Sequence, residues 1–156
     1  MYTTVYIVNY KEHFMELALL RTLMDKDFHD NHKGIRCPNS IFSKEGRKVK
    51  ATIDAAITTY GRDVTPIEVE ALFFSKNPTL TTAQKDSYQG IFDKVEREVI
   101  MGVDIASDVL SDMFRQHVGE EVANLGFEYV NGEHLSLEPL RAILENYNED
   151  FTPNLS

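Results

Sequence analysis

The stretch Tyr60–Phe74, YGRDVTPIEVEALFF, contains the clearest structural signals in the chain. Gly61 is the residue type that most readily takes the left-handed conformation found just after a helix. Beyond a short polar link, Thr65 can act as an N-cap, Pro66 suits the first helical position, and Glu68 is placed to close a capping box. The stretch therefore predicts the end of one helix, a short link and the start of another helix, with no residue pattern for catalysis.

Helical periodicity continues on both sides of this connection. A helix is expected over about 44–60, because Val49, Ile53 and Ile57 recur at helical spacing. Farther along, Thr81 and Gln84 predict a second capping box that opens a helix over about 82–98. A long helix over about 103–129 and a short one over 137–147 complete this part of the chain.

The N-terminal part is also expected to be helical. Asn9 and Glu12 predict the start of a first helix. The segment DKDFHDNHKG, residues 25–34, predicts a short helix or turn that ends at Gly34.

These elements predict an all-α chain, in which a small helical bundle is followed by a long antiparallel helical hairpin over about 82–131. The helical domain is expected to span 10–148, after a tail at 1–9 and before the start of a linker at 149–156. Two helices alone cannot bury apolar residues on both sides, so the hairpin should pack on the rest of the domain, on a second copy, or on both. The candidate hairpin and self-association residues are Ile91, Phe92, Val95, Val109, Leu110, Met113 and Phe114.

The composition is that of an ordinary soluble globular protein, with 42% hydrophobic and 26% charged residues. No run of about 18 apolar residues predicts a membrane span, and the first residues lack the pattern of a secretory signal. A single cysteine, Cys37, excludes an internal disulfide framework and fits a reducing cytoplasm.

The net charge of −9 argues against a general nucleic-acid binder, because binding to phosphates needs a basic surface. The charge is uneven, however, since residues 33–50 carry six cations and one acid. Two interpretations of this basic segment are open: a solvated face, which charge runs usually form, or a contact patch for an acidic partner or a nucleic-acid strand. The candidate patch consists of Lys33, Arg36, Lys44, Arg47, Lys48 and Lys50.

Patterns that support chemistry are scarce, and we expect no catalytic, cofactor-binding or metal-binding residue in this chain. The phosphate-binding motif G-x-x-x-x-G-K-[ST] does not occur, so no nucleotide hydrolysis is expected. His29 and His32 could hold a metal together with Cys37, but polar residues of a short surface helix are the favoured interpretation. Cys37 is interpreted as a buried, inert thiol, and His117 as a core histidine in an apolar stripe.

The order of these parts resembles the N-terminal domain of DnaB-like replicative DNA helicases, in the form found in phages of the T4 type. The resemblance runs through MELALLRTLMDKDFHDNH (15–32), KATIDAAITTYGRDVTPIEVEALF (50–73) and YQGIFDKVERE (88–98). It continues through DIASDVLSDMFRQHVGEEVANLGFEYV (104–130), with Arg115 at the place of a recurring arginine, and SLEPLRAILENYN (136–148). It therefore covers the chain from about Phe14 to Asn148, as a pattern of elements and not as a catalytic signature.

The resemblance implies the collar of a ring helicase, in which domains pair through their hairpins and primase, or a helicase loader, docks. It places the ATPase, with its ATP and magnesium, in a downstream motor domain, and contact with DNA in the full-length helicase. It also implies the cytoplasm of a bacterial host. Two alternatives stay open from sequence: a free-standing small phage adaptor or inhibitor that binds a host replication protein, and a small metal enzyme built on His29, His32 and Cys37.

Overall fold

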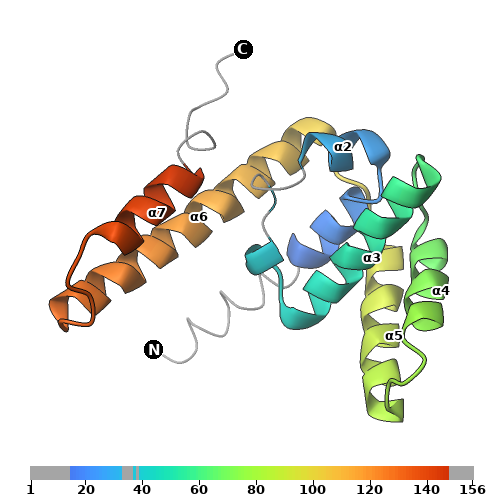
Figure 1. The fold of residues 1–156 in the computed structure, drawn as a ribbon. Coiled ribbons are helices and arrows are strands. Elements are labelled where there is room, and N and C mark those ends of the chain that lie inside the picture. Colours follow the sequence, from blue (N-terminus) through green and yellow to red (C-terminus); the bar gives the residue numbers. More distant parts are fainter. Residues whose placement is uncertain (1–14, 33–36, 38, 148–156) are drawn as a thin grey trace, which may run out of the picture. The chain divides into compact units, whose positions relative to one another are not determined.

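The structure, a computed structural model, describes residues 15–32, 37 and 39–147 of the 156-residue chain. Every regular element in these ranges is helical, which confirms the predicted all-α class. Residues 15–22 are helical and are followed, in order along the chain (Figure 1), by α2 (Lys26–Asn31), the 3-10 turn η2 (Asn39–Ile41), α3 (Lys44–Tyr60), α4 (Pro66–Lys76), α5 (Thr82–Arg97), α6 (Val103–Val130) and α7 (Glu138–Tyr147). The predicted cap at Asn9 and the predicted linker lie outside the described residues.

The connection between α3 and α4 forms as predicted. Gly61 is the C-cap of α3 in the left-handed region, with φ of 65°, and its N–H donates to the carbonyl of Ile57 at 2.8 Å. At the start of α4, the hydroxyl of Thr65 accepts from the backbone N–H of Glu68, and the Glu68 carboxylate accepts from the N–H of Thr65 at 3.0 Å. Thr81 and Gln84 form the second predicted capping box, at the start of α5. Local sequence therefore determines where these helices begin and end.

The contacts divide the chain into two compact units, which we describe separately. Unit 1 comprises residues 1–32 and 42–106, and unit 2 comprises residues 33–41 and 107–156. The boundary falls inside α6, so α5 belongs to unit 1 and most of α6 to unit 2. The antiparallel hairpin over 82–131 and the domain limits at 10 and 148 stay predictions.

The core of unit 1 is built on the packing of α4 against both α3 and α5. Between α4 and α5, the ring of Phe73 lies 4.5 Å from that of Tyr88 and 5.4 Å from that of Phe92 (centroid distances). Apolar side chains of the first helical segment, of the turn that follows it, of α2 and of α3 are also buried: Leu19, Leu20, Leu23, Met24, Phe28, Val49, Ile53 and Ile57. The apolar stripes that predicted these helices thus form one core.

Unit 2 is built around α6. The helix ends in a turn where Gly132 takes a φ of 77° and the N–H of Glu133 donates to the carbonyl of Glu128 at 3.0 Å, the pattern of a Schellman cap. The hydroxyl of Tyr129 donates to the carbonyl of Ser136 at 2.6 Å, which ties the end of α6 to the segment entering α7. The buried apolar residues of this unit are Cys37, Leu110, Phe114, Val118 and Leu125.

Within the described ranges, no helix combines the length and apolar character that crossing a bilayer requires.

Candidate functional site: a polar network and the candidate contact surfaces

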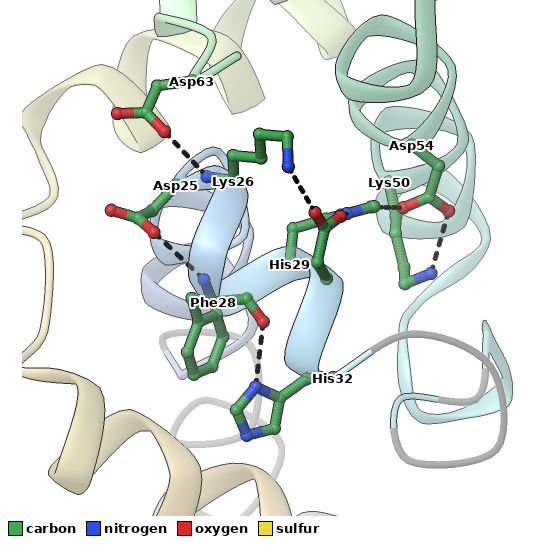
Figure 2. A network of polar contacts seen from close by, with 9 residues as sticks. Asp25, Lys26, Phe28, His29, His32, Lys50, Asp54 and Asp63 are labelled. Atoms are coloured by element: carbon green, nitrogen blue, oxygen red, sulfur yellow. Dashed lines mark hydrogen bonds and ion pairs between the residues drawn. The ribbon is translucent and has the colours of Figure 1, made fainter. Parts of the chain in front are cut away.

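The most connected polar cluster of unit 1 joins α2 to α3. Figure 2 shows His29 of α2 facing Asp54 and Lys50 of α3. The Nε2 of His29 lies 2.7 Å from Asp54 Oδ1, and the Nζ of Lys50 donates to Asp54 Oδ2 at 3.0 Å. The other ring nitrogen of His29, Nδ1, lies 3.2 Å from Asp30 Oδ1. His29 and Lys50 are only 4% and 5% exposed, whereas the side chains of Asp30 and Asp54 are 36% and 37% exposed, so the cluster extends from the interior of unit 1 to its surface.

The network favours a charged histidine. The hydrogen bond to Asp54 raises the pKa of His29 above its usual value, outweighing burial, and the bond to Asp30 raises it further. Burial alone would raise the pKa of the Asp54 carboxyl, but hydrogen bonds from His29 and Lys50 outweigh it and hold that pKa below its usual value. The contact therefore favours the protonated form of His29 and the ionised form of Asp54, the combination that makes a charge-assisted pair.

The same cluster fixes the orientation of α2. The carboxylate of Asp25 caps α2 by accepting from the N–H of Phe28 at 3.0 Å. The backbone N–H of Lys26 donates to Asp63 Oδ1 at 2.8 Å, and its Nζ donates to Asp30 at 2.7 Å. Asp63 belongs to the link that follows α3, so α2 is bonded both to α3 and to the segment that leaves it. A six-residue helix, which has little stability of its own, is held in place by these bonds.

The interpretation of His29 as a surface residue is wrong. The ring is buried, and carboxylates engage both of its nitrogens, so the ring joins two helices and does not present a nitrogen to a substrate. His32 is half-buried, with its Nδ1 2.9 Å from the carbonyl oxygen of Phe28. Across the described residues, no group of three or more His, Cys, Asp or Glu side chains could hold a metal ion. Cys37 lies in unit 2, whereas both histidines lie in unit 1.

A second histidine cluster occurs in unit 2, around His117 of α6. Its Nε2 lies 2.9 Å from the hydroxyl of Ser40 and 3.0 Å from Glu121 Oε1. A Ser-His-acid triad needs the hydroxyl and the carboxylate on different ring nitrogens, because the acid orients the ring while the other nitrogen takes the proton. Here both partners share one nitrogen, so the arrangement does not have triad geometry. The His117 side chain is 16% exposed, at the edge of the apolar stripe and not deep within it.

The basic segment is less uniform than its sequence indicated. Lys44, Arg47 and Lys48 are exposed on the first turns of α3. Lys50, in contrast, is buried and neutralised by Asp54, so it does not belong to an accessible patch. Lys33 and Arg36 lie outside the described residues. Of the candidate residues that the structure describes, three are accessible, all on α3, and the role of the segment as a contact patch stays a prediction.

Sequence reasoning also missed Glu16, a buried carboxylate that is 5% exposed. Its Oε1 accepts from the backbone N–H of Ser43 at 2.6 Å, directly before the start of α3. The hydroxyl of Ser43 in turn accepts from the N–H of Gly46 at 3.0 Å. A negative charge at this position complements the partial positive charge at the N-terminus of α3. No local signal reveals this contact, because the two residues are 27 positions apart.

The candidate self-association residues are mostly internal. Phe92 and Val95 are buried in unit 1, and Leu110 and Phe114 are buried in unit 2. The remaining candidates, Ile91, Val109 and Met113, are half-buried. Four of these seven positions are therefore buried, and the role of the set between copies stays a prediction.

Other large apolar side chains are exposed. In unit 1 they include Ile67 on α4 at 68% exposure and, after α5, Val99 at 80% and Ile105 at 59%. In unit 2 they lie on the second half of α6, in the turn after it and on α7; these are Val122, Phe127, Val130, Leu135, Leu137 and Leu144. These unit 2 residues lie close together in the sequence, and exposed apolar residues that gather on one surface, unlike scattered ones, indicate contact with another molecule.

Comparison with known proteins adds no relative to this description. Searches of protein-family models, of curated proteins and of solved structures returned no match to this chain.

Proposed function

We propose that this chain is the all-helical N-terminal domain of a phage replicative DNA helicase of the DnaB-like type, where it assembles copies and docks primase or a helicase loader. The order of parts in the sequence, which resembles that family's collar, supports the proposal, and the described parts of that order are helical. The ATPase motor of such a protein would occupy a separate domain, and contact with DNA would be made by the full-length helicase in the host cytoplasm.

The observation that carries the proposal is the cluster of exposed apolar side chains on unit 2. Phe127, Val130 and Leu135 are 69%, 84% and 102% exposed, and all three lie within nine residues of one another. An enzyme site would instead gather polar groups in a concave pocket. A surface of this kind suits assembly or docking, because burying it against a partner is favourable by about 25 cal/mol per Å² of apolar area.

Two measurements test the proposal. The first is the reading frame of the source gene downstream of Ser156: a G-x-x-x-x-G-K-[ST] motif in the same frame is expected, since a ring helicase needs an ATPase. A stop codon directly after Ser156 would favour the free-standing adaptor instead.

The second measurement is sedimentation of the purified chain over a range of concentrations, in which self-association is expected. A chain that stays monomeric at every concentration would count against the assembly role.

A further inference from the structure

The turn after α6 contains the one asparagine of the sequence that is followed by glycine. Asn131 and Gly132 come directly after Val130, the last residue of α6, and both are exposed. Among the described residues, no hydrogen bond holds the Asn131 side chain, and a Cβ atom built on Gly132 would meet nothing within 4 Å. The Asn131 side chain and the Gly132 backbone are therefore both open to water.

An Asn-Gly pair offers the least hindered form of a reaction between asparagine and its own backbone. The carboxamide carbon of an asparagine can reach the backbone nitrogen of the next residue, because the two close a five-membered ring. Glycine favours this closure, since it has no Cβ to crowd its nitrogen. Asn124, by contrast, is followed by Leu125 inside α6, and Asn77 is followed by Pro78, whose nitrogen carries no hydrogen.

We propose that Asn131 is a site of spontaneous deamidation in the folded chain. The Gly132 nitrogen, once its proton has passed to water, attacks Cγ of Asn131, so that an N–Cγ bond forms. The Cγ–Nδ2 bond breaks, and ammonia leaves with a proton from water. Water then opens the succinimide ring at either of its two carbonyl carbons, which leaves an aspartate or an isoaspartate at position 131. The net reaction consumes one water and releases one ammonia, with no oxidant or reductant.

The fold restrains the reaction at this turn. The N–H of Gly132 donates to the carbonyl of Tyr129 at 3.1 Å, and the N–H of Asn131 donates to that of Phe127 at 3.0 Å. The bond to Tyr129 must break before the Gly132 nitrogen can lose its proton and turn toward Cγ. The rate in the folded chain is therefore the rate in an open turn, multiplied by the fraction of time for which the turn is open.

That fraction is large enough for the reaction to proceed. Helix ends open at a low cost in free energy, and the cap of a helix lowers the open fraction by about tenfold at most. The bond from the Tyr129 hydroxyl to the carbonyl of Ser136 lowers it by a similar factor at most, about tenfold. We therefore expect Asn131 to deamidate at most about a hundredfold more slowly than the same pair in a free peptide.

Deamidation weakens the end of α6. It adds a carboxylate at the C-terminal end of the helix, which already carries a partial negative charge, and α6, which the structure describes throughout, has no basic residue in its last turn. Glu128 and Glu133 are nearby in the sequence and also carry carboxylates. An isoaspartate also lengthens the backbone by one atom, so the bond from the N–H of Glu133 to the carbonyl of Glu128 no longer fits.

The new charge also falls among the exposed apolar side chains of unit 2. Phe127 and Val130 precede position 131, Leu135 follows it, and these side chains are 69%, 84% and 102% exposed. A carboxylate among them opposes burial of this surface against a partner, because the charge would have to lose its water. The deamidation site does not depend on the proposed function, but this consequence for assembly and docking does.

Mass spectrometry tests the site. The purified chain and a synthetic peptide of residues 127–137 are incubated under the same conditions at neutral pH. Proteolytic fragments are then followed for the mass change from amide to acid and for the separate elution of isoaspartate. We expect conversion at Asn131, at most about a hundredfold slower than in the peptide, and far slower conversion at Asn124 and Asn77. A rate at Asn131 below that range, or no higher than at Asn124, would overturn the proposal.

A Tyr129→Phe variant tests the restraint by the turn. It removes the hydroxyl that donates to the carbonyl of Ser136 and leaves the Asn-Gly pair unchanged. We expect deamidation in the folded variant to be about two- to tenfold faster than in the wild-type chain. Peptides that carry tyrosine or phenylalanine at this position should react at equal rates. Equal rates in the two folded chains would show that this bond does not restrain the reaction.

An Asn131→Asp variant carries the charge of the product and tests its effect on assembly. In sedimentation we expect it to self-associate at least about tenfold more weakly than the wild type. Gln116→Glu is the control, because it adds the same charge at an exposed position of α6, about 22 Å away along the helix. Association equal to that of the wild type would refute the effect on assembly. A wild-type chain that is monomeric at every concentration would refute the assembly role, and the mass measurement would still decide whether Asn131 deamidates.

Discussion

Replacing Gly46 by alanine probes the contact between Glu16 and the start of α3. A Cβ atom at position 46 would lie 2.0 Å from Glu16 Oε1 and 2.8 Å from its Cδ, distances that real atoms do not tolerate. The Glu16 side chain is buried, and the same Oε1 accepts from the N–H of Ser43 at 2.6 Å. The carboxylate must therefore move and lose this hydrogen bond, or the first turn of α3 must shift.

The expected cost combines two opposing effects. Losing a buried hydrogen bond to a charged group costs about 1.5–3 kcal/mol. Replacing glycine by alanine inside a helix stabilises by about 0.5–1 kcal/mol, because alanine has less freedom to lose on folding. We therefore expect Gly46→Ala to lower the free energy of unfolding by about 1–2 kcal/mol.

Urea unfolding followed by circular dichroism measures this free energy. Gly90→Ala is the matched control, because Gly90 lies inside α5 of the same unit and a Cβ there would meet nothing within 4 Å. This control should be stabilised by about 0.5–1 kcal/mol. In a Glu16→Ala background no carboxylate clashes with the added Cβ atom, so Gly46→Ala should no longer lower the free energy of unfolding. A Gly46→Ala protein as stable as the wild type would refute the reasoning, as would an unchanged cost in the Glu16→Ala background.

Three further predictions concern unit 1. His29→Gln should lower the free energy of unfolding by about 1.5–3 kcal/mol at pH 6. Because the pKa of His29 is raised in the folded state, the stabilisation by its charge is complete below the unfolded pKa of about 6.5 and declines as the pH rises through the folded pKa. Urea unfolding of the variant and the wild type should therefore show a smaller difference in stability at pH 9 than at pH 6. In the same assay, Thr65→Ala should lower the free energy of unfolding by about 1 kcal/mol, because the N-cap of α4 is lost. Thr79→Ala, at an exposed loop position, should leave the free energy of unfolding unchanged. Phe92→Ala should lower the free energy of unfolding by about 3–5 kcal/mol, because Phe92 is 1% exposed and packs on Phe73. Calorimetry should show a lower melting temperature, and this decrease should not depend on protein concentration.

Signals carried by a few neighbouring residues were readable from the sequence. The caps at Thr65 and Thr81 and the left-handed Gly61 occur where they were predicted, because each depends on bonds to residues at most four positions away. The limits of α3 and α5 agree with the expected limits to within one residue for the same reason.

Contacts between distant residues were not readable. His29 and Asp54 are 25 positions apart, and their pairing depends on how α2 packs on α3. The spacing of Lys50 and Asp54 was a local signal, since residues four apart face each other on a helix, and it could have excluded Lys50 from the basic patch. The long helix α6 was the hardest case, because it is apolar on both sides and its sequence does not say which side a core will cover.

The single cysteine of the chain has a practical consequence. Cys37 is 1% exposed and belongs to unit 2. A thiol reagent cannot reach its sulfur in the closed structure, so the rate of labelling at low urea measures how often this part of the molecule opens. Because no second thiol competes, no engineered probe is needed. Comparing the free energy of this local opening with that of complete unfolding will reveal whether the two compact units open together or one at a time.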